Sequence, residues 1–226
     1  MKALILKIPV LRSIARAVYF TIIAPLKPFT GSEDYWKQRY KSGGNSGAGS
    51  YHGLAEFKAE ILNGFVQDRQ IRTVIEYGCG DGNQLRLSEY PSYTGFDVSP
   101  EAISQCKDIF SDDEAKVFKL MSDYANETAQ LTLSLDVIYH LIEDGVFHDY
   151  MKRLFDSSTE FVIIYSSNTD EQQRFQAAHM KHRKFSQWID QNRPGWKLMQ
   201  HIPNRYLCAS NKHEGHLADF YIYEKA

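Results

Sequence analysis

From residue 72 onward, short apolar runs alternate with segments whose apolar residues recur at helical spacing. Five runs rich in β-branched and aromatic residues predict buried strands, at 73–77, 93–98, 116–120, 131–139 and 161–165. Helices are predicted between and after them, from about residue 83, after Ser99, over 146–155 and over 170–192. Two late runs predict a hairpin-like pair, at 196–202 and 218–223. This alternation predicts an α/β fold with a mostly parallel sheet and helices on both faces.

The first 32 residues follow a different pattern, with basic residues interleaved among apolar ones and no acidic residue. No uncharged apolar run approaches the roughly 20 residues that a membrane-spanning helix needs. The charges do not precede one apolar block, so the pattern does not favour a secretory signal. We therefore predict a basic amphipathic extension over 1–32. Two interpretations stay open: residues 1–28 lie on an anionic membrane surface, or they pack on this domain or on a partner subunit.

The domain itself is predicted over 33–226, and residues 33–66 form its N-terminal segment, a candidate lid. Ser32, followed by Tyr35 and Trp36, is typical of a capped helix start. A glycine- and serine-rich run at 42–50 is typical of a flexible linker. Apolar residues at helical spacing then predict a helix over 54–66.

The most informative stretch begins at the end of the first strand, where Glu76-Tyr77-Gly78-Cys79-Gly80-Asp81-Gly82-Asn83 stands. Glycine has no Cβ, so such a turn lets a ligand lie against bare backbone. A dinucleotide fingerprint would need a sixth-position glycine, and Asn83 stands there instead. The pattern is acidic-x-Gly-x-Gly-x-Gly. It resembles the first motif of the class I S-adenosylmethionine (SAM) methyltransferases.

Acidic residues also end the other predicted strands. Open α/β sheets bind ligands outside the carboxyl ends of their strands, where Glu76, Asp97 and Asp123 fall and near which Asp136 falls. A carboxylate there can accept two hydrogen bonds from a ribose diol, whereas an isolated one often only caps the following helix. Three acidic residues in this order, together with the glycine turn, favour a cofactor site.

The resemblance implies a Rossmann-like seven-stranded sheet with an antiparallel last strand, and SAM as the cofactor. It implies that the methionine and ribose part lies on the glycine turn and that Asp97 binds the ribose. It further implies that Asp123 contacts the adenine amino group, with Val98 or Tyr124 packing on the ring. The complete candidate cofactor set is Glu76, Gly78, Cys79, Gly80, Gly82, Asp97, Val98, Asp123, Tyr124 and Asp136. An aromatic-rich segment folds over the pocket in similar enzymes, which makes Tyr35, Trp36, Arg39 and Tyr40 lid candidates.

His140 is the candidate catalytic residue. It follows the fourth strand, where the family often places a residue facing the acceptor, and a hydroxyl acceptor needs a base as it attacks. The alternative is a packed structural histidine. Asp136, His140 and Glu143, with His179 and His182, also resemble the ligand set of metal-binding small-RNA 2′-O-methyltransferases. Tyr139 stands where their acid-x-x-acid-His motif has its second acid, so we predict no metal site.

Composition narrows these options. A chain of 226 residues suits a single domain with a sizeable core. A net charge of -2 and the lack of a wide basic stripe do not favour a nucleic-acid partner. Three cysteines without CxxC spacing favour neither a disulfide framework nor a zinc site, and a reducing, cytoplasmic compartment is the simpler interpretation.

The sequence therefore predicts a SAM-dependent methyltransferase that O-methylates a small molecule, or a saccharide or glycolipid acceptor at the inner face of a membrane. The basic extension and a general likeness to bacterial methyltransferases of surface-polysaccharide pathways motivate the second acceptor class. Methylation of RNA or protein is one alternative. A non-catalytic SAM-binding scaffold protein is another.

Overall fold

The computed structural model describes residues 29–173, 176–206 and 218–226. The predicted membrane-facing segment 1–28 lies outside these residues, so the boundary of the extension stays a prediction. Within the described part of the chain, no helix combines the length and apolarity needed to cross a membrane.

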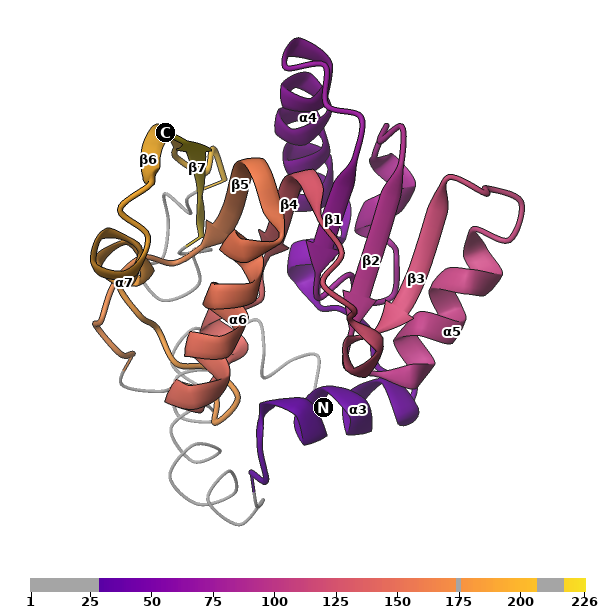
Figure 1. Cartoon of the computed structure of the whole chain (residues 1–226). Coiled ribbons are helices and arrows are strands. Elements are labelled where there is room, and N and C mark those ends of the chain that lie inside the picture. The colour runs from indigo at the N-terminus through magenta and orange to yellow at the C-terminus, as the bar shows by residue number, and fades with distance from the viewer. Residues whose placement is uncertain (1–28, 174–175, 207–217) are drawn as a thin grey trace.

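Seven strands form one sheet in the order β3-β2-β1-β4-β5-β7-β6 (Figure 1). The strands are β1 Val74–Tyr77, β2 Tyr93–Asp97, β3 Lys116–Leu120, β4 Ala129–Leu135, β5 Ser158–Ser166, β6 Trp196–Ile202 and β7 Asp219–Lys225. Strands β1 to β5 pair in parallel, and β7 is inserted antiparallel between β5 and β6. The predicted fold class is confirmed.

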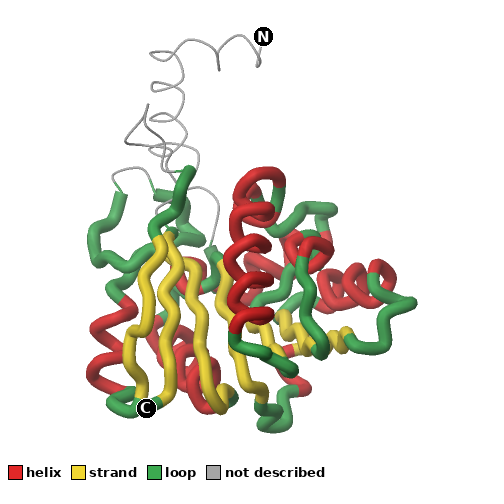
Figure 2. Tube along the Cα trace, turned by 90° about the horizontal axis from the view of Figure 1, so that it is seen from above, coloured by secondary structure: helices red, strands yellow, loops and turns green. Residues whose placement is uncertain are grey.

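Successive strand residues point to opposite faces, so both faces carry a hydrophobic core. On one face, Val74 of β1 and Leu133 of β4 pack with helices α4 (His52–Asp68) and α5 (Pro100–Ile109). On the other face, residues such as Ile75 and Ile164 pack with α6 (Asp144–Asp156) and α7 (Phe185–Asn192). Figure 2 shows these helices on both sides of the sheet. Helix α3 (Ser32–Lys41) belongs to neither layer and lies across the carboxyl ends of the strands (Figure 1).

Two predicted helices are shorter in the structure than the sequence indicates. The glycine turn leads only into a 3-10 turn, Gln84–Leu87, because Tyr90 and Pro91 soon begin the approach to β2. Of the stretch predicted as a helix over 170–192, Phe185–Asn192 is helical, and the described residues 170–173 and 176–184 are not. In these described residues the side chain of Gln172 binds the main chain of His182, in place of a helical pattern.

Capping and one strand end also differ from expectation. Ser99 caps α5 as predicted, its Oγ accepting from the Ala102 amide at 3.3 Å. Ser32 does not cap α3, because Gly31 occupies the N-cap position and the Ser32 side chain binds elsewhere. Strand β4 ends at Leu135 rather than at 139, because Asp136 adopts a positive φ of 60° that extended backbone does not allow.

Candidate active site

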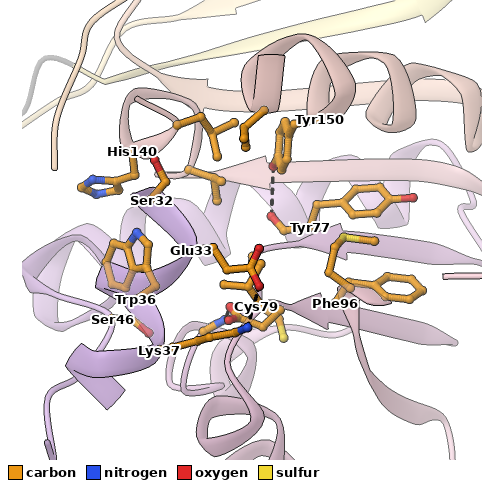
Figure 3. A pocket seen from close by; sticks show the side chains of 18 of the residues that line it. Ser32, Glu33, Trp36, Lys37, Ser46, Tyr77, Cys79, Phe96, His140 and Tyr150 are labelled. Atoms are coloured by element: carbon orange, nitrogen blue, oxygen red, sulfur yellow. Dashed lines mark hydrogen bonds and ion pairs between the residues drawn. The ribbon is translucent and has the colours of Figure 1, made fainter. Parts of the chain in front are cut away.

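A cavity of about 820 Å³ lies at the carboxyl ends of β1, β2 and β4, beneath α3 (Figure 3). Of the predicted cofactor residues, seven line it: Glu76, Gly78, Cys79, Gly80, Asp97, Val98 and Asp136. The candidate base His140 lines it as well. The strand ends therefore bring most of the predicted site into one place.

The glycine turn forms the floor of this cavity. Gly78 and Gly80 have φ values of 84° and 60°, which glycine adopts without strain. A Cβ on Gly78 would lie 2.5 Å from Val137 Cγ2, and a Cβ on Gly80 would overlap Ser46 Oγ. The turn is tied to the next strand because the amides of Gly78 and Cys79 both donate to the Phe96 carbonyl oxygen, at 2.7 and 3.1 Å.

Asp97 ends β2 beside this turn. Its Oδ2 accepts from the Gly80 amide at 3.0 Å, and its Oδ1 accepts from the Ser99 amide at 2.9 Å. Burial raises the pKa of Asp97, while these main-chain donors oppose the rise. An ionised carboxylate has about four acceptor sites, so these main-chain donors leave acceptor capacity for a ligand hydroxyl.

Glu76 is more deeply enclosed. Its Oε2 accepts from the Tyr93 hydroxyl at 2.6 Å, and the side chain is 5% exposed. Burial raises the pKa of Glu76 to about 7, against the hydrogen bond from Tyr93 and the nearby Lys58 ammonium. The carboxyl group therefore titrates near neutral pH.

Asp136 lies on the opposite side of the glycine turn, beyond β4. Its Oδ2 binds Lys58 Nζ at 2.6 Å, and its Oδ1 accepts from the Tyr139 hydroxyl at 2.7 Å. A Cβ on Gly49 would lie 2.5 Å from Asp136 Oδ2, so the glycine-rich run passes directly over this carboxylate. Lys58, from α4, also lines the cavity.

Helix α3 and the run after it cover the cavity. Trp36 and Tyr40 line it, whereas Tyr35 stacks on His179 with ring centroids 4.2 Å apart and Arg39 binds the Asn45 carbonyl oxygen at 2.6 Å. We call residues 32–51 the cover segment.

The cover segment is attached at both ends through side chains. At its start, Ser32 Oγ donates to Glu143 Oε2 at 2.6 Å. Near its end, the Ser46 amide and the Tyr51 hydroxyl both donate to Asp81 Oδ2, at 2.9 and 2.7 Å. The run predicted as a flexible linker is therefore folded onto the glycine turn.

His140 lies at the edge of the cavity against Trp36, with ring centroids 4.9 Å apart (Figure 3). Its Nδ1 is 2.9 Å from the His179 carbonyl oxygen, which can only accept, so Nδ1 carries the hydrogen. Burial lowers the pKa of His140 to about 4. The imidazole is therefore neutral at pH 7, with Nε2 as its acceptor.

The cavity has features that fit SAM. The bare backbone at Gly78 and Gly80 admits a ligand, and Asp97 keeps acceptor capacity for a ligand hydroxyl. Gln84 lines the cavity at 6% exposure, and its Oε1 has no hydrogen-bond partner among the residues that the structure describes. A buried orphan acceptor costs free energy until a donor reaches it. These residues would hold the cofactor.

No protein-family model matches the chain, and no curated protein sequence does. Solved structures of other proteins do match the chain in fold. The N-methyltransferase NodS from Bradyrhizobium japonicum WM9, in complex with S-adenosyl-L-homocysteine (SAH), superposes with a TM-score of 0.65 at 10% identity, over 86% of this chain and 98% of that one. The methyltransferase domain of bacterial CtHen1 gives 0.58 at 18% identity, over 76% and 100%. Magnesium protoporphyrin IX methyltransferase from Synechocystis PCC 6803, with bound SAM, gives 0.57 at 12% identity, over 95% and 97%. The chain has the fold of the SAM-dependent methyltransferases.

Three predicted cofactor residues of this methyltransferase fold do not line the cavity. Gly82 faces Cys106 and Phe110, and Tyr124 packs edge-on against Phe96 beneath the site. Asp123 lines a second hollow beside α5, which shares Pro100 and Leu120 with the cavity. The cofactor contacts of these three residues stay predictions. At Asp123 the cause is the 3-10 turn Met121–Asp123, which brings Met121 and Ser122 to the cavity instead.

Sequence reasoning missed Lys58 and Gln84. Lys58 sits in an amphipathic helix with no motif around it, so nothing in its neighbourhood indicated a buried cation. Gln84 directly follows the glycine motif, and its polar side chain at the start of a predicted helix facing the ligand was a usable signal. Cys79 lines the cavity as predicted, and hydrogen bonding to Cys106 together with burial raises the pKa of its thiol.

The residues that resemble a metal set are engaged in other contacts. Tyr139 binds Asp136, and Glu143 binds Ser32. His182 is buried against Ser167, with Nδ1 and Oγ 2.7 Å apart. Among residues 29–173, 176–206 and 218–226, no three histidine, cysteine or acidic side chains are grouped to hold a metal ion.

Proposed function

We propose that the protein is a SAM-dependent methyltransferase that O-methylates a small molecule or a saccharide. The observation that carries the cofactor part is Asp97, which lies in the cavity with one oxygen on the Gly80 amide of the glycine turn. A carboxylate at a strand end can bind a ribose while the rest of the ligand lies along the glycine turn. The bound cofactor would supply an electrophilic methyl group on a sulfonium.

The protein's own part in such a reaction is to position the acceptor and to remove its proton. His140 suits the second task, because its hydrogen bond to the His179 carbonyl fixes the tautomer with Nε2 as acceptor. Its low pKa keeps the imidazole unprotonated over the whole physiological range. Trp36 packs against the His140 ring and so limits how that ring can turn.

The cofactor proposal is tested by calorimetric titration of SAH into the wild-type protein and into Asp97→Ala. Micromolar binding that the variant loses supports it. A well-folded wild type that does not bind SAH contradicts it, and a scaffold role without cofactor would then replace it.

The hydroxyl-acceptor proposal is tested by methyl transfer from SAM to a panel of hydroxyl, amine and RNA acceptors, with His140→Gln as the variant. We expect the hydroxyl panel to contain the substrate and the variant to lose roughly 100-fold or more in kcat. An unchanged kcat in His140→Gln would remove His140 as the base. Activity confined to RNA would favour the alternative function.

A saccharide or glycolipid acceptor at a membrane remains part of the proposal through residues 1–28, whose basic amphipathic sequence favours an anionic surface. The measurement is co-sedimentation with anionic liposomes for the full chain and for a variant that lacks these residues. Equal partition of the two proteins would contradict this part of the proposal.

A further inference from the structure

Arg183 is a buried arginine with no part in the function proposed so far. It is 8% exposed, and its guanidinium lies 4.7 Å from the centroid of the Phe147 ring. Its Nη1 donates to the Leu141 carbonyl oxygen, and its Nη2 donates to the Ile142 carbonyl oxygen at 2.8 Å. The same Nη2 binds Asp144 Oδ1 at 2.7 Å. Arginine is almost never fully buried unless it is paired, and this one binds two successive main-chain carbonyl groups with the two arms of its planar fork.

The two carbonyl groups directly follow His140 in the chain. Residues 179–183, which we call the strap, run beside this stretch and bind it at two further points. The Lys181 amide donates to the Tyr139 carbonyl oxygen at 2.8 Å. The His179 carbonyl oxygen is 2.9 Å from His140 Nδ1 and accepts its hydrogen. The guanidinium at the end of the strap therefore fastens the main chain that supplies a hydrogen-bond acceptor to the candidate base.

The strap itself is neither helix nor strand, so its shape depends on side chains. Gln172 Nε2 donates to the His182 carbonyl oxygen at 2.8 Å, and Gln172 Oε1 accepts from the His182 amide at 3.0 Å. The His182 side chain is buried against Ser167. The strap is thus held by Gln172 within the connection from β5 to α7 and by Arg183 on the stretch after β4.

The position of one carbonyl oxygen decides the tautomer of His140. In a neutral imidazole, the nitrogen that donates a hydrogen bond carries the hydrogen, and the lone pair stays on the other nitrogen. We propose that Arg183 is a positioning residue that holds the His179 carbonyl oxygen against His140 Nδ1 and so keeps the lone pair on Nε2. This inference rests on the proposed role of His140 as the base, but the tautomer can be measured without any acceptor.

The experiment measures the tautomer directly, by long-range proton–nitrogen NMR correlation on the full chain with isotope-labelled histidine. The His140 signals are identified by their loss in His140→Gln. In wild type at neutral pH we expect the Nδ1–H form of His140 to exceed the other tautomer by about tenfold, as one well-made hydrogen bond allows. Arg183→Met should lose most of this excess, because the strap is then free to withdraw its carbonyl oxygen.

Kinetics give the second measurement, with the acceptor that the hydroxyl panel identifies. A misplaced catalytic group costs rate rather than cofactor binding, so Arg183→Met should lose about 10- to 100-fold in kcat and keep its SAH affinity within about threefold. The parallel loss of tautomer and kcat separates positioning from a general loss of stability.

Arg193→Met is the matched control. Arg193 also donates to a main-chain carbonyl oxygen, that of Lys152 at 3.0 Å, and also pairs with an aspartate, Asp156, at 3.1 Å. Its guanidinium lies 5.7 Å from the centroid of the Trp188 ring. This arginine follows α7 and does not line the cavity. Its loss should leave the His140 tautomer as in wild type.

Two further variants keep the test decisive. Arg183→Met leaves two carbonyl oxygens without their donor and could fail to fold. Gln172→Ala is milder, because Gln172 is exposed, and it should shift the tautomer in the same direction by about threefold. Arg183→Lys restores the charge beside Asp144 but not the planar fork, so it should recover thermal stability more than the tautomer ratio.

The failures are distinguishable. If the folded variants among Arg183→Met and Gln172→Ala keep the wild-type tautomer, the positioning role is wrong, whatever the rates. If Arg193→Met shifts the tautomer as much as Arg183→Met does, the effect is general and the inference is also wrong. If the tautomer shifts in the strap variants alone while His140→Gln keeps the full kcat, Arg183 positions His140 as inferred, and it is the proposed base that is wrong.

Discussion

The floor and the cover of the cavity are built by different means. The floor is held mainly through main-chain amides: those of Gly78 and Cys79 donate to the Phe96 carbonyl oxygen, and that of Gly80 donates to the Asp97 carboxylate. The cover segment is attached by side chains, such as Ser32 on Glu143, 111 residues away, and Asp81 on Ser46 and Tyr51. The floor lies directly against paired strands, whereas side-chain hydrogen bonds and the ring contacts of Tyr35 and Trp36 hold the cover.

Because of this difference, we expect the floor and the cover to respond separately to mutations and to pH. The floor is joined to the end of β2 by hydrogen bonds next to the sheet, so we expect its local stability to approach the global value. A cover that depends on individual hydrogen bonds, each contributing about 1 kcal/mol, can be displaced while the sheet stays folded. Ligand entry then requires motion of the cover alone.

The largest effect is expected in the floor, from Asp97→Ala. The change removes the acceptor of two buried amides and the proposed ribose ligand, so SAH affinity should fall by at least about 100-fold. Calorimetry measures the affinity, and thermal unfolding checks the fold. Asp108→Ala, on the exposed side of α5, is the matched control and should bind as wild type does. Retained affinity in Asp97→Ala would mean that the ligand does not lie on the floor.

Acidification should weaken the cover next. Burial lowers the pKa of both His140 and His179 to about 4, and Trp36 and Tyr35 of the cover segment pack on these rings. Both imidazoles take up protons more readily in the unfolded chain, where the pKa of histidine is about 6.5. Their contribution to stability is therefore complete above about pH 6.5 and is lost as the pH falls toward 4.

The measurement is the free energy of unfolding against pH for wild type and for His140→Gln/His179→Gln. Each shifted pKa unit corresponds to about 1.4 kcal/mol, so the wild-type curve should fall more steeply than the variant's between pH 6.5 and 4. Glu76, whose pKa is raised to about 7, changes the free energy of unfolding with pH in the opposite direction. It is present in both proteins, so the comparison is unaffected. Arg39, which lowers the pKa of His179, is also unchanged. Parallel curves would contradict the prediction.

Gly80→Ala tests the contact between floor and cover. Alanine at this position would have to adopt a φ of 60°, which costs conformational free energy. Its Cβ would also overlap Ser46 Oγ and lie 2.9 Å from the Tyr40 hydroxyl oxygen. We expect a loss of roughly 1–3 kcal/mol in the free energy of unfolding, with faster hydrogen exchange at 42–50. Gly64→Ala is the control, because Gly64 lies inside α4 with no atom within 4 Å of a Cβ. Gly64→Ala should raise the free energy of unfolding by about 0.5–1 kcal/mol. Equal losses of stability in the two variants would show that the clash at Gly80 is absent.

The same contrast explains what the sequence could predict. Glu76, the glycines and Asp97 lie at strand ends that periodicity locates, so the floor follows from local pattern and the resemblance. Asp123 was placed by the same reasoning, but a single 3-10 turn after β3 moved it out of the cavity. Lys58 and the Ser32–Glu143 contact depend on how α4 and α3 pack against distant segments, which no local pattern encodes. The glycine-rich run at 42–50 shows the limit of prediction from local sequence. Its composition is typical of a flexible linker, but its contacts with Asp81 set its structure.

The smallest expected effect is at the other attachment of the cover, from Ser32→Ala. The Ser32 hydroxyl donates to Glu143 Oε2 at 2.6 Å and accepts from the Ile142 amide at 2.8 Å, while its own amide donates to Glu143 Oε1 at 2.9 Å. Alanine keeps the last bond and loses the first two, which predicts a loss of about 1 kcal/mol. Hydrogen exchange should quicken in the first turn of α3 and stay unchanged in β1 and β4, because their protection comes from sheet pairing. Faster exchange in the strands as well would mean that cover and floor open together, and the division between them would then be wrong.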